Sequence, residues 1–363
     1  MDDAQATAFA PSDAVQAIPL ALSMGDPCGI GPELALMAWR DRRPGDQPFF
    51  VLADPDHLQR LAKTVGIETP IEACDPRMAA QVFSRALPVV PLRARIDGRP
   101  GAPTLADAQG AIEAIERGTE LVHAGVAAAL VTNPISKDSL YRAGFRHPGH
   151  TEFLGELALR FWGVEALPVM MLWSPLLAVV PVTIHVSLRQ SLADLTRAKI
   201  VETARIAARD LAQRFGVTTP RLAIAGLNPH AGENGAMGTE ERDFIAGAVA
   251  DLCAEGIDAR GPLPPDTMFH AEARARYDAA ICMYHDQALI PIKTLAFDHA
   301  VNVTLGLPFV RTSPDHGTAF DIAGTGRADP ASLIAALRLA ATLSARDRAR
   351  PAALDDNSPR RRA

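Results

Sequence analysis

Three histidines follow apolar segments that have the composition of buried strands. His185 follows LLAVVPVTI, His230 lies just beyond RLAIAGL, and His285 follows AAICMY. In an open α/β sheet, ligands bind where the carboxyl ends of the strands meet loops. Imidazole is the commonest side-chain metal ligand, and three neutral imidazoles leave coordination positions open, as a catalytic ion needs. Taken singly, each histidine is better explained as a structural loop residue that caps a strand or satisfies a carbonyl. Three of them at equivalent strand ends favour one shared divalent-metal site as strongly as three separate structural roles.

Two further segments carry residues suited to binding an anion. In PGHTEFLGELALRF (148–161), His150 and Thr151 stand where a loop turns into a helix, and free N–H groups there suit phosphate or carboxylate. The same pattern also fits an ordinary Thr N-cap. Lys293, Asn302 and Arg311 lie farther along the chain, close to His285, in a segment that is otherwise apolar and rich in turns. A lone Lys or Arg is usually a solvated surface charge, but this closeness favours binding. Arg311 is predicted to open a binding loop, RTSPDHGTAFD.

Two glycine-rich loops have a less specific pattern. GDPCGIGPE (25–33) follows a predicted strand, and NPHAGENGAMGTEE (228–241) precedes a predicted helix. Either could cradle a phosphate or a cofactor, and either could be a plain tight turn. Neither contains a Rossmann fingerprint or a Walker loop.

The elements that position these residues alternate between strands and helices. Near-continuous apolar runs are typical of strands buried on both faces, and they occur at 18–24, 49–54, 126–132, 176–184, 221–227, 279–284 and 301–307. Helical patterns lie between them at 106–125, 192–216 and 240–256. This alternation predicts an α/β protein with a largely parallel sheet.

Composition limits the class of protein. The 363 residues carry a formal net charge of −6, which argues against a general nucleic-acid binder but not against small anionic substrates. The four cysteines form no C-x-x-C pair, so neither a disulfide framework nor a thiolate zinc site is expected. No secretory signal or membrane-length apolar run is present, which predicts a soluble cytoplasmic protein. Residues 1–16 and 346–363 are predicted to be disordered.

Together these segments resemble the 4-hydroxythreonine-4-phosphate dehydrogenase family of vitamin B6 biosynthesis. The similarity runs in order from about residue 18 to residue 345, and its motifs are GDPCGIGPE, VTNPISK, GHTEF, the strand end at His185, GLNPHAGENGAMGTEE, GPLPPDT, YHDQALIPIK and NVTLGLPFVRTSPDHGTAFDIAG. Several of these motifs are long and chemically unusual, so they are specific for the family. Related dehydrogenases of phosphorylated threonate or erythronate share them.

The resemblance implies an isocitrate/isopropylmalate dehydrogenase-like fold, with two α/β domains and the active site in the cleft between them. The domains are expected at 17–149 plus 305–345 and at 150–304, and the second is expected to carry the metal ligands and the dimerisation surface. A homodimer is implied, with metal ligands drawn from both subunits. Carried over by motif, the metal ligands fall on His185, His230 and His285, and the substrate contacts on His150, Thr151, Lys293, Asn302 and Arg311.

The resemblance also implies the reaction. The C3 hydroxyl of 4-phosphooxy-L-threonine is oxidised with NAD or NADP, and the β-keto acid then loses CO2 to give 3-amino-2-oxopropyl phosphate. A divalent metal (Zn²⁺, Mg²⁺ or Co²⁺) is expected to assist both halves. Lys293, Asp266 and Asp286 are the candidates for proton transfer. The alternative is a dehydrogenase of 4-phospho-threonate or 4-phospho-erythronate in sugar-acid catabolism. A phosphate acyltransferase, a metallohydrolase and a non-catalytic phosphate-binding protein are less compatible with these features.

Overall fold

The strands of this protein form one continuous mixed sheet. The computed structural model describes residues 17–142, 144–145 and 149–349, and within them the sheet has 12 strands in the order β3-β4-β2-β1-β5-β12-β11-β6-β7-β10-β8-β9. The strands are β1 (Leu20–Ser23), β2 (Phe49–Ala53), β3 (Ile71–Ala73), β4 (Leu87–Pro91), β5 (Leu130–Thr132), β6 (Val169–Ser174), β7 (Leu177–Pro181), β8 (Arg221–Ala225), β9 (Asp258–Leu263), β10 (Ala279–Cys282), β11 (Val301–Leu305) and β12 (Arg311–Pro314).

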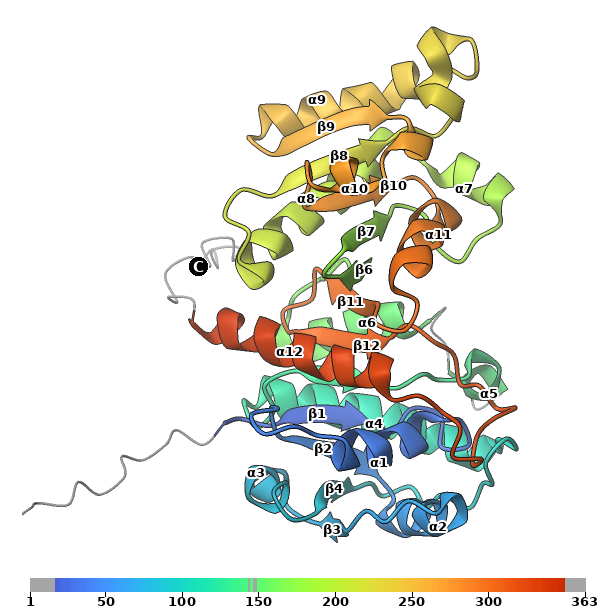
Figure 1. Cartoon of the computed structure of the whole chain (residues 1–363), viewed down its shortest axis with the longest axis vertical. Helices are drawn as coiled ribbons and strands as arrows, with labels where there is room; N and C mark the ends of the chain where they lie inside the picture. The colour runs from blue at the N-terminus through green and yellow to red at the C-terminus, as the bar shows by residue number, and fades with distance from the viewer. Residues whose placement is uncertain (1–16, 143, 146–148, 350–363) are drawn as a thin grey trace, which may run out of the picture.

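The sheet consists of two parallel blocks joined by antiparallel strands. β1 to β5 and β12 pair in parallel, as do β7, β10, β8 and β9. Between the blocks, β12 with β11, β11 with β6 and β6 with β7 are antiparallel pairs. Figure 1 shows the arrows of β1, β8 and β9 pointing to the same side of the molecule. The carboxyl ends of both blocks therefore line one side of the protein.

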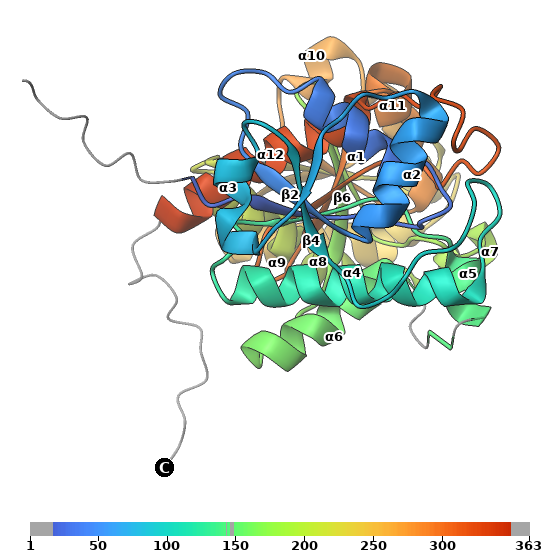
Figure 2. The ribbon, with the colours of Figure 1, turned by 90° about the horizontal axis from the view of Figure 1, so that it is seen from below.

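Helices cover both faces of this sheet. Figure 2 shows α4 and α6 on one face and α1, α2 and α11 on the other. The α-helices are α1 (Gly31–Arg40), α2 (Pro55–Val65), α3 (Ala79–Val82), α4 (Leu105–His123), α5 (Lys137–Arg142), α6 (His150–Trp162), α7 (Leu188–Asp194), α8 (Arg197–Asp210), α9 (Ala246–Ala254), α10 (Ala271–Arg274), α11 (His285–Ala296) and α12 (Ala331–Ala349). Shorter 3-10 turns are η1 (Pro76–Met78), η3 (Pro229–Gly235) and η5 (Pro265–Thr267), and η2 (Leu211–Phe215) and η4 (Glu241–Ile245) are π-helical. Among the described residues, no helix has the length and apolarity of a membrane span.

The alternating pattern predicted from the sequence is confirmed, and several details differ. Each of the seven predicted strands corresponds to an observed one, whereas β3, β4, β6, β9 and β12 were not predicted. The helix expected over 192–216 is interrupted, because the Thr196 hydroxyl accepts the backbone N–H of Lys199 and starts α8 anew. α12 continues to Ala349, past Arg346, where a disordered tail was predicted to begin. The rest of that predicted tail and residues 1–16 lie outside the described residues.

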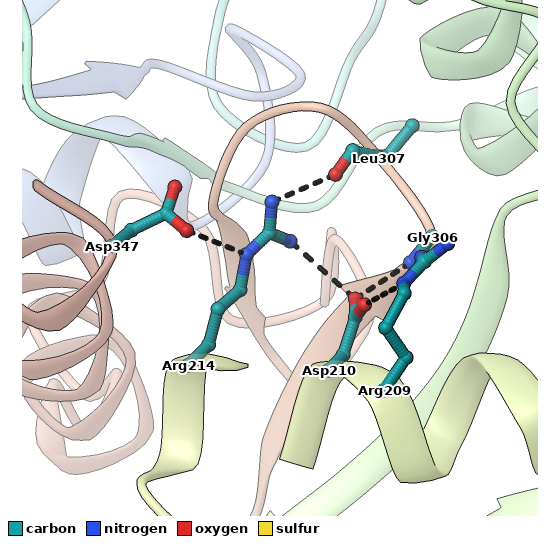
Figure 3. A network of polar contacts seen from close by, with 6 residues as sticks. All are labelled: Arg209, Asp210, Arg214, Gly306, Leu307 and Asp347. Carbon is teal, nitrogen blue, oxygen red and sulfur yellow. Dashed lines mark hydrogen bonds and ion pairs between the residues drawn. The ribbon is translucent and has the colours of Figure 1, made fainter. Parts of the chain in front are cut away.

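The hairpin of β11 and β12 joins the two blocks, since β11 pairs with β6 and β12 with β5. Its turn is fixed by the polar network in Figure 3. Asp210, at the end of α8, accepts the backbone N–H of Gly306 at 2.8 Å, and Arg214 donates to the Leu307 carbonyl at 2.8 Å. Arg214 also contacts Asp347 of α12 at 3.4 Å. Helices that cover different blocks therefore hold the same turn.

Candidate active site

A cavity of about 690 Å³ opens on the side where the carboxyl ends of the strands lie. Six residues that the sequence predicted for the site line it: His150, Thr151, His185, Lys293, Asn302 and Arg311. They come from α6, the segment after β7, α11, β11 and β12. Five separate parts of the chain thus converge on one cavity, and both blocks of the sheet contribute to it.

Arg311 lies buried at the base of this cavity, with 5% of its surface exposed. The prediction that it opens a loop is wrong, because Arg311 is the first residue of β12. Its guanidinium donates to the Thr132 hydroxyl at 2.7 and 3.2 Å and to the Thr304 hydroxyl at 2.9 Å. No carboxylate pairs with it among the described residues, and burial lowers its pKa to about 9. A buried charge without a counter-charge is a strong site for an anion.

His150 and Thr151 begin α6, as the sequence predicted, and Gly149 rather than Thr151 is the N-cap. No described side chain caps this helix, so its first backbone N–H groups are left for another acceptor, and Gly149, His150, Thr151 and Glu152 at its start line the cavity. Arg311 lies 3.3 Å from His150 Nδ1, and the pKa of His150 falls well below its usual range because of burial, Arg311 and Lys137. The imidazole is therefore neutral, and an N–H donated by Arg311 to Nδ1 leaves a proton on Nε2. In the described part of the chain, Nε2 is buried without a hydrogen-bond partner.

Lys293 and Asn302 also line the cavity. The Lys293 ammonium forms an ion pair with Asp315 at 2.9 Å and also donates to the Asp315 carbonyl at 3.2 Å. Burial raises the pKa of Asp315, and the ammonium of Lys293 opposes that rise. The charge of Lys293 is thus already balanced by the protein, in contrast to that of Arg311.

The three histidines predicted to hold a metal are only partly brought together. The ring centroids of His185 and His285 lie 5.8 Å apart. His285 Nδ1 contacts an Asp286 carboxylate oxygen at 2.7 Å, so its Nε2 is free to act as a ligand. His230 lies elsewhere in the chain, with 60% of its side chain exposed, and its Nδ1 is 4.0 Å from Asp266. Within residues 17–349, excluding the undescribed gaps, no three His, Cys, Asp or Glu residues are grouped closely enough to hold a metal.

The family model for the pyridoxal phosphate biosynthetic protein PdxA matches residues 46–340. The chain belongs to the PdxA family. It is 60% identical over 331 residues to the 4-hydroxythreonine-4-phosphate dehydrogenase of Methylorubrum populi, covering 90% of this chain and 95% of that relative. Identity to the enzyme of the same name from Bradyrhizobium diazoefficiens is 58% over 336 residues, with 90% and 97% covered. The crystal structure of a 4-hydroxythreonine-4-phosphate dehydrogenase from Klebsiella pneumoniae superposes with a TM-score of 0.80 at 37% identity, covering 92% of this chain and 99% of that one. The predicted family and its α/β fold are confirmed.

Three further side chains support the predicted residues without any sequence signature of that role. The hydroxyls of Thr132 and Thr304 solvate Arg311, yet both lie in or at the end of apolar strands, where a threonine is an ordinary packing residue. Glu241 is buried beside the His230 loop and accepts the backbone N–H groups of Leu227 and Asn228, each at 2.7 Å. Burial acts to raise the pKa of Glu241, and hydrogen bonds from Asn228 bring it below its usual value.

The loop that Glu241 holds has an unusual backbone. His230, Ala231, Glu233 and Asn234 all have positive φ, at 52°, 51°, 41° and 57°. Non-glycine residues rarely take up this left-handed conformation, and a run of them persists only where surrounding contacts enforce it. The ionised Glu241 supplies such contacts at the start of the loop. The exposed position of the His230 ring is therefore built into the fold.

Proposed function

We propose that this protein is an NAD(P)- and divalent-metal-dependent dehydrogenase that oxidises 4-phosphooxy-L-threonine at C3, with decarboxylation to 3-amino-2-oxopropyl phosphate, in vitamin B6 biosynthesis. Its relatives are named 4-hydroxythreonine-4-phosphate dehydrogenases, which supports the predicted activity and the amino-acid substrate over phosphorylated threonate or erythronate. The observation that carries the proposal is the cavity that unites His150, Arg311 and Lys293 beside His185. It offers an anion site and a metal-binding edge within reach of one small substrate.

His185 and His285 of one chain fit two ligands of a divalent ion, since the centroids of their rings lie 5.8 Å apart. We propose that His230 of a second copy of the chain supplies the third. Such an ion would act as a Lewis acid toward the C3 hydroxyl and would stabilise negative charge as CO2 leaves. The Asp286 carboxylate holds the His285 ring in the tautomer that presents Nε2. This arrangement supports a positioning role for Asp286.

An apolar surface beside these histidines supports a homodimer. Ile290 on α11 and Phe297 directly after it are 65% and 73% exposed, and Leu188 and Leu192 on α7 are also exposed. Figure 1 shows α7 and α11 on the same side of the molecule. Large apolar side chains that gather on a surface mark a contact with another protein. A second copy seated there would lie next to His185 and His285.

Lys293 and Arg311 have different roles in this proposal. The Lys293–Asp315 pair lies on the cavity wall, and a proton shared between these groups can move to or from the substrate. Arg311 has no acid partner among the described residues and binds an anionic group of the substrate. Asp266, 59% exposed and next to His230, would approach the site only together with the His230 loop of the second copy.

The test is complementation between inactive variants. His185→Ala, His230→Ala and His285→Ala should each abolish formation of reduced nicotinamide from 4-phosphooxy-L-threonine, as should a chelator, and added metal should reverse chelation. Coexpressed His230→Ala and His285→Ala chains should regain activity, because one site of each mixed dimer keeps all three ligands. With random pairing, about a quarter of wild-type activity returns.

Coexpressed His185→Ala and His285→Ala chains are the matched control. These two ligands come from the same chain in the proposed site, so no mixed dimer has an intact site and activity should stay absent. Recovery in this control would show that the ligands are distributed differently between the subunits. Full activity of a thoroughly metal-stripped wild-type enzyme would refute the metal requirement itself.

A further inference from the structure

The cationic side chains that line the cavity differ in whether a carboxylate of the protein forms an ion pair with them. Lys293 is paired with Asp315. Among the described residues, Arg311 is bonded to two hydroxyls and to the neutral His150 and to no carboxylate. The third cation is Lys137, which no motif assignment placed in the site although it closes the segment VTNPISK. Lys137 forms no ion pair or hydrogen bond with any described residue through its ammonium group, so its charge is available.

Lys137 is placed beside the start of α6. It is the first residue of α5, whose preceding segment follows the carboxyl end of β5. A Cβ atom added to Gly149, the N-cap of α6, would lie 3.6 Å from Lys137 Nζ. The ammonium also lies near enough to His150 and His185 to lower the pKa of each, although burial is the larger cause in both. Its charge thus faces the cavity.

Four kinds of donor therefore surround one end of the cavity. They are the ammonium of Lys137, the guanidinium of Arg311, the unpartnered Nε2–H of His150 and the uncapped N–H groups at the start of α6. A helix N-terminus of this length favours an anion. The phosphoryl group is the substrate's most highly charged part, and it can accept hydrogen bonds through three oxygens. The carboxylate carries one charge and two acceptors, which leaves donors unused.

We infer that Lys137 is a substrate-binding residue and that it binds the phosphoryl group between α5 and the start of α6, opposite Arg311. This inference rests on the proposed function and adds an orientation to it. The phosphoryl end lies at α6, and the carboxylate and C3 face Lys293 and the histidines. Lys137 contributes charge and hydrogen bonds to binding, and it takes no part in proton or hydride transfer.

Glu152 lies close to the proposed phosphoryl position and has the opposite charge to Lys137. Its Oε2 would lie 2.9 Å from the same added Cβ of Gly149, so a carboxylate stands close to the proposed phosphoryl position. Like charges in proximity oppose binding. Removing the charge with Glu152→Gln should therefore strengthen the binding of inorganic phosphate, whereas removing that of Lys137 should weaken it. A merely structural role for either residue would not produce opposite signs.

The experiment measures inorganic phosphate binding by calorimetry and steady-state kinetics with 4-phosphooxy-L-threonine. Lys137→Ala should raise the Kd of inorganic phosphate at least about tenfold and raise KM by about 30- to 100-fold with kcat within about threefold, the scale of one charge-assisted hydrogen bond. Lys137→Arg should keep most of the affinity. Lys199→Ala, on the exposed surface of α8, is the matched control and should behave as wild type.

Two results would overturn the inference. One is unchanged inorganic phosphate affinity in Lys137→Ala. The other is a loss of kcat at constant KM, which would place Lys137 in the chemical step. The calorimetric arm does not depend on turnover. If wild-type enzyme fails to oxidise 4-phosphooxy-L-threonine, the proposed function is wrong while phosphate binding still decides the role of Lys137.

Discussion

Arg311 and Arg214 are both buried, but within the described part of the chain only Arg214 has carboxylate partners. We therefore expect the loss of each charge to affect stability differently. Burial lowers the pKa of Arg311 from 12.5 to about 9, which corresponds to roughly 5 kcal/mol of desolvation cost in the folded protein. In Arg311→Met that cost disappears. Thr132, Thr304 and His150 each lose a donor, at about 1 kcal/mol apiece.

Arg311→Met should therefore raise the free energy of unfolding by at most about 2 kcal/mol, which is roughly 3 °C in Tm for a chain of this size. Because the anion loses its buried partner, kcat/KM for 4-phosphooxy-L-threonine should fall at least about 100-fold. Arg214→Met is the control, and it should destabilise the fold by about 3 kcal/mol, since it strips a partner from the buried Asp210.

Thermal unfolding and steady-state kinetics on the two variants test this reasoning. Wild-type Tm should also rise more with added inorganic phosphate than that of Arg311→Met, because a bound anion balances the guanidinium only in the wild type. A Tm for Arg311→Met that is as low as that of Arg214→Met would refute the claim that the Arg311 charge destabilises the empty protein. Retention of near-wild-type kcat/KM would refute its role in binding.

Two further predictions concern assembly and pH. Phe297→Glu places a charge on the exposed apolar surface at the end of α11, so sedimentation should show monomers and turnover should be lost. The control Leu159→Glu on α6 should change neither the oligomeric state nor turnover. An active monomeric Phe297→Glu would contradict the shared site. Burial lowers the pKa of His57, whose Nε2 bonds the Pro27 carbonyl. Below about pH 6.5 the unfolded chain binds a proton at this ring that the folded protein does not bind. The neutral His57 therefore contributes its full stability above that pH. This stability is lost as the pH falls, by up to about 1.4 kcal/mol per pH unit. Urea unfolding should show a shallower loss on acidification for His57→Gln, whose amide can keep the bond, and an identical pH profile would contradict this assignment.

Sequence reasoning could group His150, Thr151 and His185 because they begin a helix or follow a strand. The apolar run before His285 and the helix pattern after His150 are local features, and both placements are confirmed. Arg311 was misplaced for a reason that no local pattern contains. A charged residue can begin a buried strand here because Thr132, 179 positions earlier, and Thr304 supply hydroxyls to it.

Lys137 was missed for a related reason. Its significance depends on having no acid partner among the described residues and on lying beside Gly149 at the start of α6, and neither property can be read from VTNPISK. The separation of His230 from His185 and His285 is equally invisible in sequence. Strand ends predict at which end of the sheet a residue lies, but not whether two residues at that end lie close together in one chain.

The β11–β12 hairpin also sets the order in which the protein can be completed during synthesis. β5 pairs with β1 on one side, but its other edge finds a partner only when β12 has been made, since Arg311 pairs in register with Leu130. At about 5–20 residues per second, the growing chain holds β5 as an open apolar edge for roughly 10–40 seconds. Ribosomes that stop before residue 311 release chains with that edge exposed, and these should aggregate or be degraded. The substrate site is therefore assembled only near the end of translation, and a truncated chain cannot mimic the active enzyme.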